Sequence, residues 1–344
     1  MKAKYISIII ILFASFNYLY AQQRMQYSQF MQNGFLLNPA IAGMEKYSDL
    51  KGGYTKQWAG FEGSPQGQFV TFSAPIGSDS TQANSTPTSI PLRGRKNSVI
   101  QSSEDKENKD STQNFHQGIG LTIFSEGDDV IIQNELSFSY AMHFPLKNKQ
   151  FISAGVSGGI RQNRFDPTSI KLINQNDLIF GNQIRNIIHP NVNLGILWYS
   201  TTFFVGLSAN QALNNSYSYD RLEPNPASSL KPHFYFNAGY KFKATELISV
   251  TPSIIVRKVF PSPISIDINA MADYKDLIRV GFSYRNKESI VAIVGFCLSH
   301  RISINYSFDF VTSDIKAYGT GTHGIILGAR LGKKSNTYIP QYFW

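Results

Sequence analysis

The chain has 344 residues, a formal charge of +9 at pH 7 and one cysteine, Cys297. A single cysteine excludes a disulfide within the chain, and its apolar surroundings suggest a small buried residue. The Lys and Arg residues are too scattered to form the basic stripe of a nucleic-acid-binding protein. The sequence has no P-loop, no Cys-x-x-Cys pair and no His-Glu-x-x-His motif. It therefore indicates no enzyme, no metal or other cofactor and no nucleic-acid partner.

The N-terminus has the pattern of a secretory signal peptide. Lys2 and Lys4 precede a short apolar run at 6–16, and Ala21 ends a suitable cleavage site. The run is shorter than the roughly 20 residues that a membrane-spanning helix needs. We therefore expect residues 1–21 to be removed during export.

Residues 22–49 are predicted to be a short helical segment that lies against or inside the rest of the protein. Its larger apolar residues follow a helical spacing: Tyr27, Phe30, Met31, Gly34 and Leu37. Asn38-Pro39 would end such a helix. The alternative is a linker that leads directly into the first strand.

The rest of the chain alternates between apolar and polar residues in segments of about ten residues. In residues 135–144 one face of a strand would carry Leu136, Phe138, Tyr140, Met142 and Phe144. The other face would carry Glu135, Ser137, Ser139, Ala141 and His143. A closed sheet with lipid outside and a wet lumen inside needs this arrangement. We predict an all-β fold: a transmembrane antiparallel outer-membrane β-barrel over residues 50–332.

Fourteen strands are predicted, an even number, as expected for a bacterial single-chain barrel. They cover residues 50–60, 66–75, 118–125, 130–145, 150–165, 190–199, 203–212, 233–243, 247–259, 264–274, 277–286, 289–298, 302–311 and 324–332. The alternation is weak in 190–199, 203–212 and 289–298. These strands either face a packed interior or have another register.

Three arginines fall in the polar register of their strands: Arg257, Arg279 and Arg285. A charge on the lipid face would cost roughly 2–4 kcal/mol at the membrane midplane, so these side chains should face the lumen. We expect them to pair there with acids such as Asp267 and Asp309.

Connection lengths alternate between short and long. The short ones are 146–149, 200–202, 244–246, 275–276 and 299–301, and the long ones are 166–189, 213–232 and 312–323. Short turns of such barrels are periplasmic and long loops lie at the cell surface, so residues 76–117 should be periplasmic. Their polar and charged composition cannot bury a core and predicts disorder. This segment is either a benign insertion or a tether for a partner, and residues 333–344 form a C-terminal tail.

At three places the sequence resembles the PorP/SprF family of type IX secretion system membrane proteins of Bacteroidota. The first stretch is 26–43, with Asn38, Pro39 and Gly43; the second is 56–65, with Gln57, Trp58, Gly60, Gly63 and Pro65. The third contains Tyr306, Asp309 and His323. Lys56 and Gly324 depart from the pattern, since the family usually has Arg and an acid there. Turn-forming glycines and prolines indicate that these residues hold the N-terminal segment in place, with Trp58 either an interfacial anchor or a contact on a plug.

The resemblance implies an outer-membrane barrel of the type IX protein secretion and gliding apparatus. Such a barrel would bind, help to export or anchor a secreted surface protein or adhesin through its C-terminal region. Its other partners would be periplasmic ring components or lipoproteins, and outer-membrane lipid.

We expect the long loops 166–189 and 213–232 to contact the secreted protein. They contain residue types that dominate interfaces, namely Phe180, Tyr217, Tyr219 and Arg221. Two alternatives remain open at this point. One is a passive porin or small-solute transporter, and the other is a core scaffold docked on the periplasmic motor ring.

Overall fold

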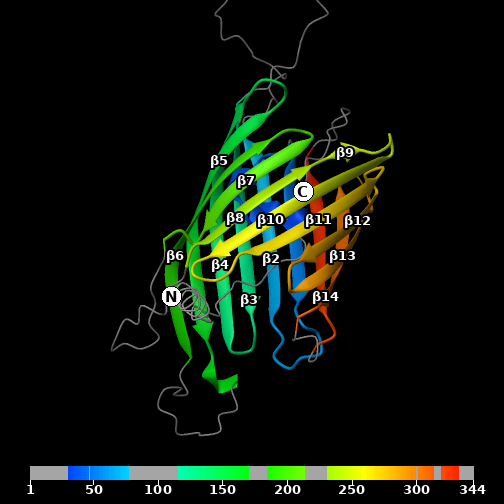
Figure 1. Ribbon diagram of the computed structural model, residues 1–344. Helices are drawn as coiled ribbons and strands as arrows, with labels where there is room; N and C mark the ends of the chain where they lie inside the picture. Colours follow the sequence, from blue (N-terminus) through cyan, green and yellow to red (C-terminus); the bar gives the residue numbers. More distant parts are fainter. Residues whose placement is uncertain are drawn as a thin grey trace, which may run out of the picture.

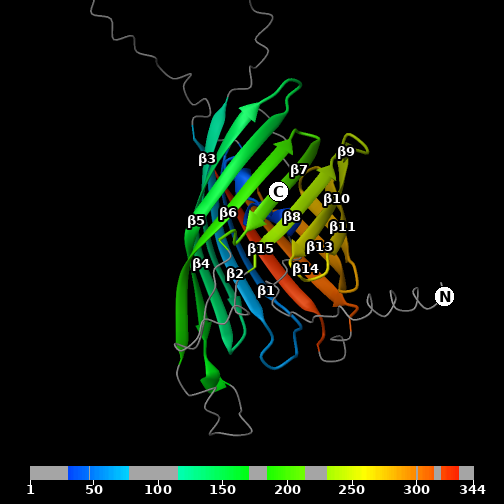
Figure 2. The ribbon, with the colours of Figure 1, turned by 60° about the vertical axis from the view of Figure 1, so that its left-hand side comes forward.

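A computed structural model describes residues 30–45, 47–76, 115–169, 184–213, 231–299, 301–313 and 319–332. Its strands form one antiparallel sheet, with each strand beside its neighbour in sequence. The first strand pairs with the last, so the sheet closes into a barrel. The strands are tilted around the barrel wall (Figure 1, Figure 2). No helix in the described part of the chain is long and apolar enough to cross a membrane.

The strands are β1 (Ser48–Lys56), β2 (Gln66–Ile76), β3 (His116–Gly127), β4 (Ile131–Pro145), β5 (Phe151–Phe165), β6 (Arg185–Tyr199), β7 (Phe203–Asn210), β8 (His233–Tyr240), β9 (Phe242–Lys243), β10 (Ile248–Val259), β11 (Ser265–Tyr274), β12 (Ile278–Arg285), β13 (Ser289–Cys297), β14 (Ile302–Val311) and β15 (Thr322–Leu331). Both β8 and β9 pair with β10 in one continuous register. The break between them is at Lys241, opposite Thr251 and next to Pro252, which has no N–H for the ladder. The barrel therefore has fourteen strands, as predicted.

Each predicted strand has a counterpart, and the differences are at the ends. The strand β6 starts at Arg185 rather than at residue 190, and β1 ends at Lys56 rather than at residue 60. The expected periplasmic insertion is shorter, because Ile76, His116 and Gln117 belong to β2 and β3. Residues 1–21, 77–114 and 333–344 lie outside the described residues.

Successive side chains alternate between an exposed outer face and a buried inner face. In β4 the outward residues are exposed, and they are the predicted set: Leu136, Phe138, Tyr140, Met142 and Phe144. The residues between them are buried, from Glu135 to His143. A shift of one residue would reverse both faces, so this pattern fixes the register of the strand.

Buried ion pairs join neighbouring strands across the inner face. Asp267 accepts hydrogen bonds from Arg257 at 2.6 Å and Arg285 at 3.3 Å, and Asp309 lies 3.8 Å from Arg285. These pairs confirm the predicted lumenal partners. Arg279 differs, since it pairs with Asp273 at 2.7 Å.

A second charged cluster connects the strands on another part of the wall. Arg161 on β5 lies 3.4 Å from Glu126 on β3 and from Glu135 on β4. Charges of both signs are thus neutralised inside the barrel, which lowers the large cost of burying them.

The N-terminal segment is helical, but it forms no continuous amphipathic helix. It contains three single turns of 3-10 helix, η1 (Phe30–Gln32), η2 (Gly34–Leu36) and η3 (Pro39–Ile41). Asn38-Pro39 ends η2 and also starts η3, because the Asn38 side chain accepts a hydrogen bond from the Ala40 N–H at 2.9 Å. The single amphipathic helix predicted here is therefore three separate turns, and the dipeptide lies between the second and the third.

The ion pairs predict a large effect of one substitution. Asp267→Ala removes the carboxylate that pairs with the buried guanidinium groups of Arg257 and Arg285. The substitution should destabilise the barrel by about 3–5 kcal/mol. Urea titration of the barrel in lipid vesicles measures this change. Arg164→Ala is the control, because its partner Asp166 is at the mouth and Arg164 is 41% exposed; it should change the midpoint little. Equal effects of the two substitutions would contradict the account.

Candidate functional site

Residues 30–45 form a plug inside the barrel, and nearly all of them are buried. The dark blue turns of Figure 1 belong to this segment. The plug lies toward the end of the barrel that carries the short turns 146–150, 200–202, 275–277 and 298–301, here called the short-turn end. The opposite, long-loop end carries the connections 166–184 and 211–232.

Three apolar clusters hold the plug against three parts of the wall. The first joins the plug to β4–β7 and contains Phe35, Ala40, Ile41, Ala42, Met44, Ala141, Phe151, Leu197, Tyr199 and Phe204. The second joins it to β10, β11 and β13 and contains Phe30, Met31, Ile255, Met271, Val291 and Ile293. The third places Leu36 against Phe69, Phe124 and Ile326.

These clusters explain the weak alternation of β6, β7 and β13. The inward residues of these strands include Leu197, Phe204 and Val291, which are apolar because they face the plug rather than water. Of the two interpretations left open by the sequence, the packed interior is correct.

Three glycines on the inner wall let the plug backbone come very close. A β-carbon on Gly155 would overlap the backbone of Pro39 and Ala40, and one on Gly118 would overlap the carbonyl of Ala42. A β-carbon on Gly195 would overlap the side-chain oxygen of Asn38. We call Gly118, Gly155 and Gly195 the glycine cradle.

The plug itself needs a glycine at the point of closest approach. Gly43 has a φ of +70°, a left-handed conformation that side chains disfavour. Its own β-carbon would overlap Gly118. The Asn38, Pro39 and Gly43 motif is therefore explained by backbone contact with the wall.

Side chains of the barrel wall form hydrogen bonds with backbone carbonyls of the plug on the side that faces the glycine cradle. Ser153 donates to the Ala40 carbonyl at 2.7 Å, and Ser208 donates to the Leu37 carbonyl at 2.7 Å. The His143 Nε2 atom donates to the Ala42 carbonyl at 2.8 Å. In the other direction, Asn38 donates to the Ile196 carbonyl at 3.1 Å. Buried polar groups need such partners, so these bonds fix both position and orientation.

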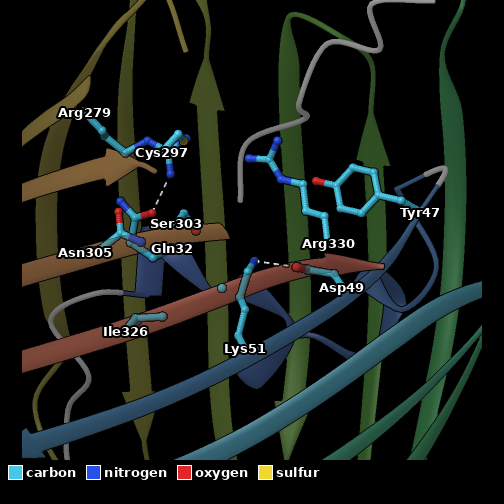
Figure 3. A pocket seen from close by; sticks show the side chains of 11 residues that line it. Gln32, Tyr47, Asp49, Lys51, Arg279, Cys297, Ser303, Asn305, Ile326 and Arg330 are labelled. Atoms are coloured by element: carbon cyan, nitrogen blue, oxygen red, sulfur yellow. Dashed lines mark hydrogen bonds and ion pairs between the residues drawn. The ribbon is translucent and has the colours of Figure 1, made fainter. Parts of the chain in front are cut away.

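The other side of the plug is held less closely. Gln32 accepts a hydrogen bond from Arg279 at 2.6 Å, at the short-turn end. A gap of about 20 Å³ remains beside this contact, enough for one water molecule. Figure 3 shows its lining: Gln32, Tyr47, Asp49, Lys51, Arg279, Cys297, Ser303, Asn305, Ile326 and Arg330. Cys297 is thus half-buried in a polar gap, not in the apolar environment expected from its neighbours in sequence.

The second motif forms an ordered turn between β1 and β2. Gln57 N–H donates to the Pro65 carbonyl, and Gly60 and Gly63 have positive φ of +92° and +73°. The Trp58 backbone is also left-handed, at a φ of +46°. The turn therefore depends on unusual backbone conformations, as its glycines suggest.

We predicted that this turn holds the N-terminal segment in place, but its hydrogen bonds go to another part of the chain. The Ala59 N–H donates to the Gly321 carbonyl at 2.7 Å, and the Thr320 N–H donates to the Ala59 carbonyl at 2.8 Å. The Trp58 N–H donates to the Thr322 hydroxyl at 3.3 Å. The motif thus joins the β1–β2 turn to the β14–β15 connection at the long-loop end.

The third motif is divided between the two faces of the wall. Tyr306 and His323 face outward and share a hydrogen bond of 2.7 Å. Asp309 faces inward, near Arg285. In the sequence His189, His233 and His323 all fall near the predicted surface mouth, where they could form a metal site or be separate polar residues of the rim. His189 and His233 face the lumen, whereas His323 faces outward, so the three do not form one site. Within the described residues no group of three His, Cys, Asp or Glu side chains is placed to hold a metal.

Two glycine patterns in the sequence look like enzyme motifs but lie in a strand or directly before one. Residues 155–159 read Gly-x-Ser-x-Gly, and residues 319–324 read Gly-x-Gly-x-x-Gly. Ser157 lies in the middle of β5, and the second pattern leads into β15. A nucleophile elbow and a dinucleotide site each need a strand followed by a helix, so neither pattern has the required geometry.

The loop residues proposed as partner contacts are Phe180, Tyr217, Tyr219 and Arg221, and all four lie outside the described residues. Sequence reasoning missed the glycine cradle and the wall groups His143, Ser153 and Ser208. For Gly118 and Gly155 the available signal was a glycine at an inward position of an alternating strand, whereas Gly195 lies in a strand with weak alternation.

A family model described as "Type IX secretion system membrane protein PorP/SprF" matches residues 19–329. The chain belongs to this family. Both the family and the barrel identify this PorP/SprF protein as an outer-membrane β-barrel of type IX secretion, which agrees with the resemblance seen in the three motifs. No curated protein sequence matches the chain.

Several solved structures are similar to this PorP/SprF protein over most of its length. The toluene transporter TbuX of Ralstonia pickettii is 9% identical, with a TM-score of 0.46 over 89% of this chain and 94% of that chain. A FadL homologue of Pseudomonas aeruginosa is 10% identical, with a TM-score of 0.43 over 85% and 91%. The translocator domain of the autotransporter NalP of Neisseria meningitidis is 10% identical, with a TM-score of 0.41 over 83% and 87%. Likenesses this distant say nothing about the function of this chain.

The glycine cradle predicts a specific effect on lumen closure. Gly155→Ala should push Pro39 and Ala40 away from the wall and raise the ion conductance of the barrel severalfold in a planar bilayer. Gly158→Ala is the matched control, because Gly158 lies on the same strand and a β-carbon there meets no atom within 4 Å. Equal conductance of the two variants would show that the plug does not rest on Gly155.

The gap beside Gln32 offers a second test, because Cys297 is the only cysteine of the chain. Gln32→Ala removes the bond to Arg279 and widens the gap, so a maleimide should label Cys297 faster than in the wild type. Glu62→Ala, in the exposed β1–β2 turn, should leave the labelling rate unchanged. An unchanged rate in Gln32→Ala would contradict this role of Gln32.

Proposed function

We propose that this barrel binds a secreted surface protein or adhesin through its C-terminal region and helps to export or anchor it in the type IX secretion and gliding apparatus. The observation that carries the proposal is the plug, in a chain whose family serves type IX secretion. A barrel built for passive permeation needs an open lumen. Here residues 30–45 occupy the lumen toward the short-turn end and pack against three parts of the wall.

The plug also favours a role as a binding platform. Its backbone is fixed by close contact and by hydrogen bonds from several strands, so the barrel has a rigid interior. A rigid barrel presents its long loops in a fixed arrangement, which suits recognition of one partner. We place the long-loop end at the cell surface and the short-turn end in the periplasm, following the connection lengths.

The remaining assignments belong to the same proposal. Residues 1–21 direct export as a signal peptide, and 76–117 extend into the periplasm, where ring components or lipoproteins of the apparatus would meet them. Loops 166–189 and 213–232 contact the secreted protein at the surface, with Phe180, Tyr217, Tyr219 and Arg221 as anchors.

A loop replacement tests the surface contact. Replacing residues 214–230 by a short Gly-Ser linker should abolish co-purification of the surface protein from the native outer membrane in mild detergent. Replacing 77–114, at the opposite end, is the matched control and should leave it intact. The reverse result would favour a scaffold docked in the periplasm. A wild-type barrel that retains no protein partner and conducts steadily would favour a porin.

A further inference from the structure

A group of inward-facing polar side chains near the long-loop end has buried atoms without hydrogen-bond partners. They lie on β5, on β6 and at the end of β7, and we call them the amide wall: Asn163, His189, Asn191, Asn210 and Gln211. Each is at least nine-tenths buried. Asn163 and His189 have no bond at either of their polar side-chain atoms.

The amide wall begins where the plug ends. Nearer the short-turn end, Gly195 and Leu197 of β6 contact the plug. The next inward residue, Asn193, is satisfied by Ser157 and by the Gln211 N–H. Beyond it Asn191 has an unpartnered amide nitrogen, and both ring nitrogens of His189 are unpartnered. Along β6, therefore, the inward polar side chains near the plug have hydrogen-bond partners and those nearer the long-loop end have atoms without a partner.

Such a wall is costly unless something binds to it. A buried polar group left without a partner costs about 1–3 kcal/mol, and native proteins keep few of them. Five such residues on three adjacent strands are therefore a feature that needs a ligand or ordered water.

The chemistry and the spacing match a polypeptide backbone. Asn and Gln side chains carry both donors and acceptors, as does a peptide group. Inward positions along β6 are two residues apart, roughly 6.6 Å, which is also the repeat of backbone groups along one edge of an extended chain. The five side chains include no carboxylate, lysine or arginine. Arg161 lies opposite His189, but it is paired with Glu126 and Glu135, so the wall would recognise the backbone rather than a charged sequence.

We propose that the amide wall binds an extended segment of polypeptide that enters the lumen from the long-loop end. This inference rests on the proposed function, and the polypeptide is then a segment of the secreted protein. The plug forms the floor of the site, and the side chains of Asn163, His189 and Asn191 bond to the backbone of the segment.

Site-specific photocrosslinking in the native outer membrane tests this placement. A photoreactive phenylalanine analogue at Asn191 should crosslink to the co-purifying surface protein. The same analogue at Ile188 is the matched control, since this residue is on the same strand, faces outward and is 65% exposed; it should give no such crosslink. Asn163 is the second position if the analogue at Asn191 prevents folding, which the heat-dependent migration of the barrel on a gel reports.

A double substitution gives an independent reading. Asn163→Leu with Asn191→Leu keeps the side-chain size and removes the amides, so retention of the surface protein should fall roughly tenfold. Ser283→Ala removes an unpartnered buried hydroxyl from β12 and should leave retention unchanged.

The outcomes separate this inference from the proposed function. A partner that is retained by the wild type and equally by the double variant, without a crosslink at Asn191 or Asn163, would mean that the amide wall holds only water. The inference would then be wrong and the proposed function would stand. A wild-type barrel that retains no partner would overturn both.

Discussion

The close approach of the plug backbone to the glycine cradle is the contact on which the rest of the interior depends. Closing a fourteen-stranded sheet leaves a lumen that side chains of the wall alone do not fill. The chain occupies part of the lumen with its own residues 30–45, and these residues fit only where Gly118, Gly155 and Gly195 leave room. Once the backbone rests there, the carbonyls of Leu37, Ala40 and Ala42 meet Ser208, Ser153 and His143.

This contact divides the lumen into two chemically different halves. Toward the short-turn end most of the inner wall is apolar or bonded to the plug, and the polar gap beside Gln32 is the exception among the described residues. Toward the long-loop end it carries buried ion pairs around Arg161 and Asp267, together with the amide wall. The charged groups are paired with groups of opposite charge, whereas amide atoms of Asn163 and Asn191 have no hydrogen-bond partner. A barrel of this kind is closed from one side and has hydrogen-bonding capacity on the other, which is consistent with holding a partner at one face.

The sequence predicts the strands well and the plug contacts poorly, for a physical reason. The outer face of every strand meets the same apolar environment, so alternation in a segment such as 135–144 is visible without knowing any neighbour. The inner face meets different neighbours from strand to strand. Leu197 is inside because it packs on the plug, and Gly155 is required by Ala40, which is far away in sequence. The inward pairing of Arg285 with Asp267 was predictable because a charge has no other acceptable place in a membrane barrel.

The central claim is that residues 30–45 are a fixed part of the barrel interior. Hydrogen–deuterium exchange of the barrel in lipid nanodiscs tests it most directly, because exchange reports the protection of each backbone amide. The account predicts that peptides covering 33–43 exchange as slowly as those from β4 and β5. Exchange of 33–43 at the rate of an unstructured chain, with slow exchange in the strands, would contradict it.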